Sequence, residues 1–181
     1  MAICKEALDL ICHFEGCLKK VGPDLYAPYR DPIGIATIGV GSIWRTDGSR
    51  VQMGDPPITR AQAMDLMDLE LSKKCEPAVD RLITTKMHPL MRGALVSFAY
   101  NLGEGALKAS NLRRAINEKR WQDVPAEFAK WRMAGGRMLP GLVRRRKAEA
   151  DMFMAGVRAL HVGVASNDNT MGWVTTITRA A

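Results

Sequence analysis

Apolar residues recur every three or four positions at the start of the chain, at Ile3, Ala7, Leu10, Ile11 and Phe14. This spacing puts them on one face of an amphipathic helix, and Gly16 is a typical helix stop. The pattern predicts a helix over residues 2–14, with Glu15 at its last turn. A carboxylate is unfavourable at that end, because the helix dipole places negative charge there. At the edge of a cleft, however, the same position suits a proton donor.

Residues 17–56 have a different pattern. Glycine, proline, aspartate and serine are dense, and short β-branched runs lie between them. Such runs between turn residues predict a small antiparallel sheet. We expect strands near residues 25–30, 35–40 and 50–53, the third following a turn at TDGS, residues 46–49.

A long helix is predicted after the Asp55-Pro56-Pro57 stop. Thr59 is a suitable N-cap, and the apolar positions that follow keep mostly helical spacing as far as residue 83. Pro77 is expected to kink or end this helix near residue 76, since proline lacks the backbone N–H that an inner turn needs.

The rest of the chain, from residue 88, predicts shorter helices. Residues 89–103 are apolar nearly all round, which is typical of a buried central helix. Further helices are expected near residues 111–119, 121–132 and 140–155. The tail, residues 157–181, has weak periodicity, and we read it either as a strap across the surface or as partly disordered.

These elements predict an α+β fold with two lobes. A sheet lobe, about residues 17–57, would be joined by the long helix to a helical lobe, about residues 80–156 plus the N-terminal helix. The catalytic domain would then span residues 1–156. Clefts between lobes are common ligand sites, and Glu15 is expected at the base of this one.

Composition is consistent with one domain or two small lobes, because the 181 residues are 47% hydrophobic. No apolar run reaches the ~18 residues needed to span a bilayer, so no stable membrane insertion is expected. Glu6 and Asp9 interrupt what would be the apolar part of a signal peptide, which predicts a protein made in the cytoplasm. The cysteines are then expected as free thiols. Cys12, His13 and Cys17 match no zinc spacing, so we expect no metal.

The net positive charge is confined to the second half of the chain. Residues 1–100 contain 12 basic and 12 acidic side chains, whereas residues 101–181 contain 14 and 7. A basic surface attracts nucleic acid, an anionic membrane or an anionic wall polymer. The run RRRK, residues 144–147, is the best argument for nucleic acid, but a solvated helix face is the simpler interpretation.

Candidate catalytic side chains are concentrated in the stretch YRDPIGIATIGVG, residues 29–41. Asp31 lies at the entrance of this strand-like stretch, Thr37 lies at its centre, and the glycines leave room for a bulky polymer. Together with Glu15, Asp31 would supply the two carboxyl groups that cleave a glycosidic bond. A threonine hydroxyl beside the acid would orient the attacking water. A turn that merely contains an acid is the alternative, and no serine-nucleophile elbow or P-loop is present.

Several motifs together resemble the phage-type lysozymes, the muramidases of glycoside hydrolase family twenty-four. FEG at 14–16 and YRDPIGIATIGVG at 29–41 look like the catalytic signature of that family. The resemblance continues through residues 58–71, 95–117 and 128–153, in the order of the family, and covers about 150 of the 181 residues. It implies a lysozyme-like two-lobed fold and hydrolysis of peptidoglycan without a metal or cofactor.

The resemblance also implies residue roles. Glu15 matches the general acid, Asp31 the carboxylate that positions or activates water, and Thr37 the hydroxyl that assists. The substrate-binding candidates that it implies in the cleft are Asn101, Trp131 and Arg137. An amide at a helix end, a core aromatic and a solvated cation are the respective structural alternatives for these three.

The match departs from the family at three places. Asp31 follows Glu15 by sixteen residues instead of the usual nine, because KKVGPDLYAP, residues 19–28, carries about seven extra residues, and Asp24 occupies the nine-residue position. Ser42 stands where a histidine often follows the TIGxG motif. The tail 157–181 has no counterpart.

The resemblance further implies a monomeric endolysin that stays in the host cytoplasm until a holin allows it to reach the wall, where peptidoglycan is its partner. Two rivals stay open. A lytic transglycosylase would use Glu15 alone. A basic nucleic-acid-binding protein would have no use for the set formed by Glu15, Asp31 and Thr37.

Overall fold

The computed structural model describes residues 3–16, 19–31 and 33–165. Its first helix, α1 (Lys5–Glu15), confirms the amphipathic pattern, since Ala7 and Ile11 are fully buried. Gly16 ends the helix: its backbone has a φ of 73° and its N–H donates to the carbonyl of Cys12. Glu15 is therefore the last residue of α1.

The sheet lobe contains two small antiparallel sheets. Strands β1 (Lys20–Gly22), β2 (Leu25–Tyr26) and β5 (Ile58–Thr59) form one of them in the order β1-β2-β5. Strands β3 (Tyr29–Arg30) and β4 (Ala36–Thr37) form the other, with Tyr29 opposite Thr37. The predicted strand over residues 25–30 thus divides between two sheets.

The predicted strand over residues 50–53 is wrong. Arg50 makes only an isolated bridge to Trp44, on the far side of the TDGS turn. The backbone N–H of Gln52 donates to the carboxylate of Asp55 (2.9 Å), and the N–H of Asp55 donates back to the carbonyl of Gln52. This local turn takes up the groups that a strand would need for pairing. The third strand is β5 instead.

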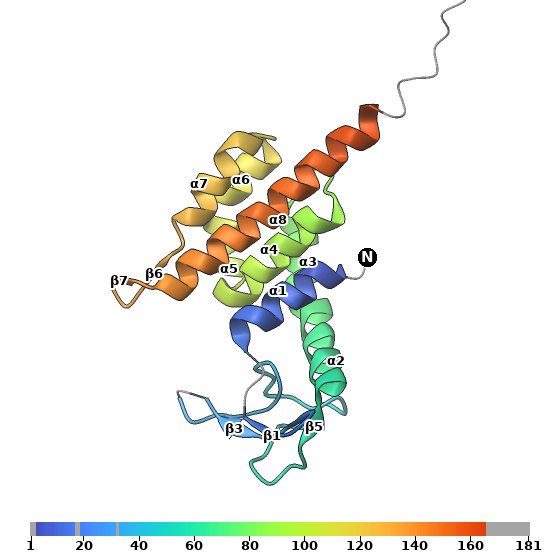
Figure 1. The fold of residues 1–181 in the computed structure, drawn as a ribbon. Coiled ribbons are helices and arrows are strands. Elements are labelled where there is room, and N and C mark those ends of the chain that lie inside the picture. The colour runs from blue at the N-terminus through green and yellow to red at the C-terminus, as the bar shows by residue number, and fades with distance from the viewer. Residues whose placement is uncertain (1–2, 17–18, 32, 166–181) are drawn as a thin grey trace, which may run out of the picture.

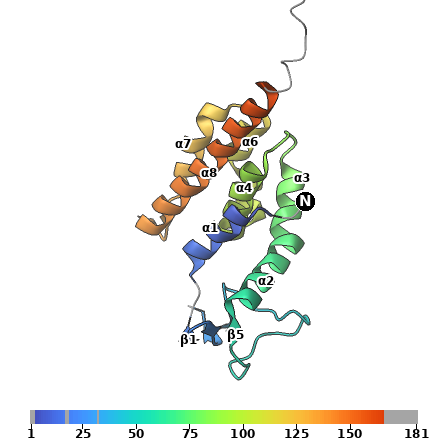
Figure 2. The ribbon, with the colours of Figure 1, turned by 45° about the vertical axis from the view of Figure 1, so that its right-hand side comes forward.

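The predicted long helix connects the lobes (Figures 1 and 2). It consists of α2 (Arg60–Glu70), a π-helical turn (Leu71–Cys75) and α3 (Glu76–Leu82). Thr59 caps it as expected, accepting from the N–H of Gln62 in a capping box. Pro77 does not end the helix. A widened turn precedes it, because proline offers no N–H to the carbonyl four residues earlier.

The helical lobe surrounds α4 (Pro89–Leu102), the predicted central helix. Residues 91–99 of α4 are all buried, and α4 packs against α1, α3 and α8. The other elements are α5 (Glu104–Ala109), α6 (Asn111–Asn117), a 3-10 turn (Trp121–Asp123), α7 (Val124–Ala129), β6 (Met133–Ala134), β7 (Arg137–Met138) and α8 (Pro140–Ala165). Helix α5 and the β6–β7 hairpin were not predicted. Helix α8 continues past residue 156 to Ala165, and residues 166–181 of the tail lie outside the described part.

Helix α1 packs closely on α4 where Gly93 meets Ala7. A Cβ atom at Gly93 would lie 2.6 Å from the Cβ of Ala7, well inside van der Waals contact. The missing side chain therefore lets the two backbones approach. Since α1 ends at Glu15, this contact helps to place Glu15 relative to the helical lobe.

An ion cluster joins α3 to α4, with Arg92 and Glu76 buried and Asp80 half exposed. Arg92 donates to Glu76 (2.7 Å) and forms two hydrogen bonds, each 2.7 Å long, to the carboxylate of Asp80. These hydrogen bonds hold the pKa of Asp80 below its ordinary value. Within the described ranges, no helix has the length and apolar character required to cross a membrane.

Candidate active site

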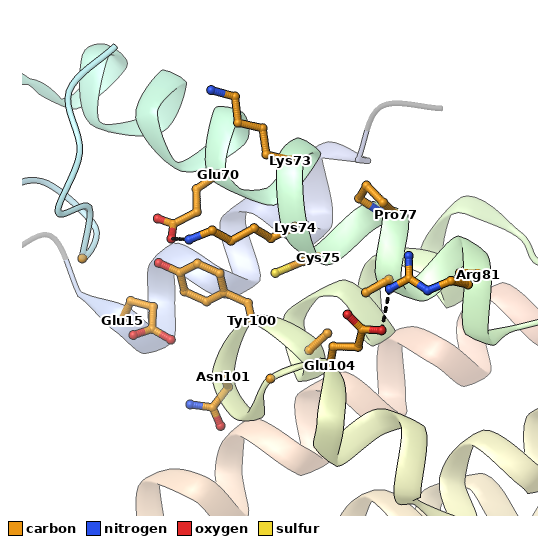
Figure 3. A pocket seen from close by; sticks show the side chains of 14 residues that line it. Glu15, Glu70, Lys73, Lys74, Cys75, Pro77, Arg81, Tyr100, Asn101 and Glu104 are labelled. Atoms are coloured by element: carbon orange, nitrogen blue, oxygen red, sulfur yellow. Dashed lines mark hydrogen bonds and ion pairs between the residues drawn. The ribbon is translucent and has the colours of Figure 1, made fainter. Parts of the chain in front are cut away.

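A cavity of about 760 Å³ lies between the two lobes. The end of α1, the glycine-rich stretch after β4, the π-helical turn, and the end of α4 with the start of α5 all contribute to its walls. Figure 3 shows Glu15 and Asn101 at one end of the cavity and the Arg81–Glu104 ion pair at the other. The predicted location of Glu15 in an interlobe cleft is therefore confirmed.

Arg145 holds Glu15 in place. This arginine comes from α8, and its Nη1 lies 2.5 Å from the Glu15 Oε1 atom. The Arg145 side chain is 4% exposed and the Glu15 side chain 28%, so the carboxylate faces the cavity while its partner is covered. The Arg145 guanidinium also lies over the ring of Phe14, 5.7 Å from the ring centre.

A buried network extends from Arg145 to the neighbouring cleft amide. Glu149, which is fully buried, lies 3.2 Å from Nε of Arg145 and 2.9 Å from Nε of Arg146, and accepts from the Ser97 hydroxyl at 2.7 Å. Arg146 in turn donates to Oδ1 of Asn101 at 3.0 Å. Burial raises the pKa of Glu149, while the two guanidinium groups and Ser97 oppose that rise.

The interpretation of RRRK as a solvated helix face is wrong for two of its four residues. Arg145 and Arg146 are 3% and 1% exposed, whereas Arg144 and Lys147 are exposed. The physical reason is that Glu149 follows on the same helix at the i+4 and i+3 positions, where it pairs with both inward-facing arginines, while Glu15 pairs with Arg145 as well. This burial also removes two charges from any nucleic-acid surface.

Tyr100 and Cys75 line the cavity and were missed by the sequence reasoning. The Tyr100 hydroxyl donates to the carbonyl of Val40 (2.9 Å), which ties α4 to the sheet lobe. Burial first, and then the charge of Glu15, raises the pKa of Tyr100. Burial raises the pKa of Cys75 to about 11, so its thiol stays protonated. Tyr100 directly precedes Asn101, which is the one signal that could have identified it.

Asp31 organises the β3–β4 hairpin. Its Oδ1 atom accepts the backbone N–H groups of Ile33 (3.0 Å) and Ile35 (2.8 Å). Thr37 is 2% exposed, and its hydroxyl donates to the carbonyl of Ile35 (3.1 Å) instead of facing the cavity. Neither Asp31 nor Thr37 is among the residues that line the cavity.

Tyr29 is a residue of the hairpin whose electrostatic environment includes Glu15. Its pKa is raised by burial, and then by the charges of Asp31 and Glu15. Both carboxylates are therefore near enough to affect one phenol. Asp24 has a different environment: its Oδ1 atom accepts the N–H of Arg60 at the start of α2 (3.3 Å).

The remaining candidates differ in their location. Asn101 lines the cavity. Trp131 is half-buried and packs edge-to-face on Phe98, with ring centres 5.4 Å apart. Arg137 is exposed on β7. Trp131 and Arg137 do not contribute to the cavity wall.

The described residues contain no group of histidine, cysteine and acidic side chains that could hold a metal ion. Cys17, part of the rejected zinc pattern, lies outside the described ranges. Lys73, Lys74 and Arg81 bring positive charge to the cavity wall. Lys74 pairs with Glu70 at 3.2 Å, and Arg81 pairs with Glu104.

Comparisons with known proteins agree with this architecture. Residues 13–149 match the model of the family described as phage lysozyme. The endolysin of Bacillus phage PZA is 32% identical over 156 residues, which cover 86% of this chain and 56% of that protein. The chain thus spans little more than half the length of this relative. The SAR-endolysin of Escherichia phage Mu is 32% identical over 124 residues, covering 68% of each chain.

A solved structure has the same fold. The endolysin from Escherichia coli O157:H7 phage FAHEc1 superposes with a TM-score of 0.71 and 31% identity, over 85% of this chain and 94% of that one. The predicted α+β fold, with a small antiparallel sheet lobe and a mostly helical lobe, is confirmed.

Proposed function

This chain belongs to the phage lysozyme family, and from that premise we propose that it is an endolysin. It hydrolyses the β-1,4 bond between N-acetylmuramic acid and N-acetylglucosamine in bacterial peptidoglycan. The observation that carries the proposal is Glu15, a carboxyl group at the end of a helix, facing the interlobe cavity and held there by the buried Arg145.

Glu15 serves as the general acid. Cleavage of a glycosidic bond needs a proton on the leaving oxygen, and a carboxyl group at the cleft surface delivers it. The ion pair with Arg145 restricts the side chain to one orientation. A fixed donor is more effective than a mobile one, because the reacting geometry is already formed when the substrate binds.

Asp31 positions or activates the attacking water. One of its oxygens is occupied by two backbone N–H groups of its own hairpin, which leaves the second oxygen for water. Thr37 assists from the opposite strand. Its hydroxyl braces the carbonyl of Ile35, whose N–H binds Asp31, so it supports the geometry of that carboxylate.

The glycan strand lies along the cavity, where Asn101 binds it. Trp131 and Arg137 contribute to substrate binding beyond the cavity. Arg137 lies on β7, and Trp131 precedes the β6–β7 hairpin in the chain. The reaction needs no metal and no cofactor, since two carboxyl groups and water supply all the chemistry of hydrolysis. The exposed basic side chains of the second half attract the carboxylates of the peptidoglycan stem peptides.

In its biological setting the enzyme lyses the host cell. A phage or prophage directs its synthesis in the host cytoplasm, a holin lets it reach the wall, and it acts there as a monomer. Induced expression with and without a holin gene tests the route: the culture should lyse promptly only when the holin is present. Lysis at the same time in both cultures would contradict this part of the proposal.

Mass spectrometry of digested peptidoglycan tests the reaction itself. Purified sacculi treated with the enzyme should yield muropeptides with reducing muramic acid ends, and Glu15→Gln should yield none. Anhydro-muramic ends would instead identify a lytic transglycosylase. An absence of new sugar ends, together with salt-dependent retention on DNA whose slope indicates several phosphate contacts, would support the nucleic-acid-binding rival.

A further inference from the structure

A smaller pocket, here called the side pocket, adjoins the interlobe cavity. It lies between the loop that follows β4 and the helical segment formed by α2 and the π-helical turn, and its volume is about 250 Å³. Glu70, Lys73 and Lys74 line both the side pocket and the interlobe cavity. The same stretch of helix therefore forms a wall of each, although the catalytic roles proposed above make no use of the side pocket.

The side pocket has an apolar wall made by Leu66, Leu69 and Trp44. Leu66 is 7% exposed, whereas the larger Trp44 is 39% exposed. The guanidinium group of Arg50 lies over the Trp44 ring, 4.1 Å from the ring centre, and an isolated β-bridge joins the backbones of the same two residues. These contacts hold the indole beside the pocket, so a surface that accepts small aliphatic groups is already formed before any ligand binds.

Three basic side chains line the same pocket. Two of them have acidic partners: Lys74 pairs with Glu70 at 3.2 Å, and Arg45 pairs with Asp55 at 2.7 Å. The third, Lys73, forms no ion pair with any residue that the structure describes. Figure 3 shows its side chain extending away from the Glu70–Lys74 pair. Lys73 therefore brings an ammonium group without a partner to a pocket that is otherwise largely apolar, and a carboxylate is the natural complement of such a group.

The size and charge of the side pocket define its ligand. The volume has room for roughly eight water molecules at ~30 Å³ each, which is enough for one or two alanine-sized residues but not for a disaccharide. The stem peptides of peptidoglycan combine alanine methyl groups with free carboxylates. We propose that the side pocket binds the stem peptide of a strand whose sugars lie in the interlobe cavity. This inference rests on the proposed function, because that function places the sugars there.

The covalent link between sugar and peptide gives this contact its effect. The peptide branches from muramic acid, so a peptide in the side pocket adds its binding free energy to that of the sugars in the interlobe cavity. The contact lies away from the bond that is cleaved, and it is made equally before and during the reaction. Uniform binding of this kind lowers KM and leaves kcat unchanged. The side pocket thus selects strands that carry peptides.

Trp44 provides a direct readout of binding. Proton–nitrogen NMR spectra of the wild-type enzyme are recorded while N-acetyl-L-alanyl-D-glutamate is added, with the Trp44 indole signal assigned from its loss in Trp44→Phe. We expect this signal to shift. The signal of Trp121, which packs against Phe153 in the helical lobe, should stay fixed. The uncharged diamide of the same compound should leave the Trp44 signal in place, because it offers Lys73 no carboxylate.

Leu69→Glu tests the pocket in the reaction itself. Leu69 lines the side pocket but not the interlobe cavity, and a glutamate there would repel the peptide carboxylates. KM is measured on peptide-bearing strands and on strands whose peptides an amidase has removed. We expect the ratio of the first KM to the second to rise roughly tenfold, as for a lost charge-assisted contact. Leu25→Glu, the same change at an exposed leucine of β2, is the matched control and should keep the wild-type ratio.

Several results would overturn the proposal. A Trp44 signal that does not move with the dicarboxylate would show that the pocket does not bind it. An equal shift with inorganic phosphate at the same concentration would indicate a general anion site. A shift that follows protein concentration, with no peptide added, would place a second copy of this chain in the pocket. Equal KM ratios for Leu69→Glu and Leu25→Glu would exclude a role in cleavage.

Failure of the proposed function gives a different result. If the chain does not cleave glycan strands, the wild-type enzyme leaves both the peptide-bearing and the peptide-free strands uncut. The NMR measurement needs no cleavage and uses only the wild-type fold, so it still reports whether the side pocket binds the dicarboxylate. It also decides the question if Leu69→Glu does not fold.

Discussion

Arg145 and Glu15 are 130 residues apart in the chain, yet Nη1 of Arg145 lies 2.5 Å from Oε1 of Glu15. The arginine belongs to α8, and the glutamate is the last residue of α1. The orientation of the Glu15 side chain therefore depends on how α8 packs against α1. A charge-assisted hydrogen bond of this kind is short and strongly directional. The position of the Glu15 carboxyl group is thus set by the packing of helices in the folded core.

Glu15→Gln should abolish cleavage and leave the fold intact. Glutamine keeps the shape and still offers an oxygen to Arg145, but it cannot donate the proton. Loss of general-acid help typically costs ~10²–10⁴-fold in rate. The measurement is clearance of a cell-wall suspension by protein whose fold is verified by circular dichroism. Glu118→Gln, an exposed glutamate of the same lobe, should keep wild-type activity; similar activity of both variants would refute the role of Glu15.

The four basic residues 144–147 should separate into two classes. Arg145→Gln and Arg146→Gln each leave Glu149 with a buried charge that is only partly paired, and we expect each to lower the free energy of unfolding by about 3 kcal/mol or more. Arg144→Gln and Lys147→Gln should change it by less than ~0.5 kcal/mol, since both side chains are exposed. Urea unfolding of the four variants decides the matter. Equal small effects would mean that the Glu149 network does not stabilise the fold.

Arg92→Met should destabilise the joint between α3 and α4 by about 3 kcal/mol at neutral pH, because Glu76 would stay buried without its partner. Arg81→Met, which breaks the exposed pair with Glu104, should cost less than ~1 kcal/mol. The two variants are compared by urea unfolding. Similar losses of stability in the two variants would show that the buried Arg92 pair stabilises the fold no more than the exposed Arg81–Glu104 pair does.

The loss of unfolding free energy caused by Arg92→Met should also depend on pH. The pKa of Asp80 is lowered in the folded state, so its contribution to stability is present at neutral pH. It is lost as the pH falls from the ordinary value of 3.8 through the lowered one. The difference between wild type and variant should therefore narrow below about pH 4. A difference that is constant from pH 7 to pH 2.5 would contradict the sign of this shift.

Gly93→Ala should damage both stability and activity. Its new methyl group would meet the Cβ of Ala7 at 2.6 Å and push α1 away from α4. Overpacking of this kind costs about 1–3 kcal/mol, and the displaced helix carries Glu15. Gly105→Ala in α5 is the matched control, because its Cβ would meet nothing within 4 Å and alanine favours a helix. Thermal unfolding and wall clearance of both variants are compared at the same temperature.

Sequence patterns correctly predicted those structural features that are determined by residues close together in the chain. The stop at Gly16, the cap at Thr59 and the apolar surface of α4 all follow from residues within a few positions of each other. The buried arginines could not be predicted in this way. Arg145 and Arg146 look like surface charges until Ser97 of α4 and Glu15 of α1 are brought beside them by the tertiary fold. The strand predicted over residues 50–53 was wrong because a turn forms there instead, fixed by one hydrogen bond to the side chain of Asp55.

The candidate site was predicted unevenly for the same reason. Glu15 was placed in the cleft by a helix pattern and a stop residue, and Asn101 by the resemblance to a family. Tyr100 was missed because an aromatic residue in an apolar helix looks like a core residue. Its hydroxyl acquires a role only when the carbonyl of Val40, from the other lobe, lies 2.9 Å away.

Asp31, and not Asp24, is expected to be the second catalytic carboxylate. Counting nine residues forward from Glu15 selects Asp24, whereas counting back from Thr37 within the hairpin selects Asp31. The hairpin count is better founded, because Tyr29 pairs with Thr37 in a fixed register. The chain between Glu15 and β3 includes a turn and can absorb extra residues at a small entropic cost, ~0.6 kcal/mol for each doubling of length.

Paired asparagine variants test this choice more sharply than alanine variants do. Asp31→Asn keeps an oxygen for the N–H groups of Ile33 and Ile35, so the hairpin is preserved and only the charge is lost. Asp24→Asn likewise keeps an acceptor for the N–H of Arg60. We expect Asp31→Asn to be nearly inactive on peptidoglycan and Asp24→Asn to be nearly normal. If Asp31 activates water for direct attack, the wild-type product should also appear first with inverted, α configuration by proton NMR. Loss of activity in Asp24→Asn alone would move the second carboxylate to the turn between β1 and β2, and it would show that the count from Glu15 was the correct one.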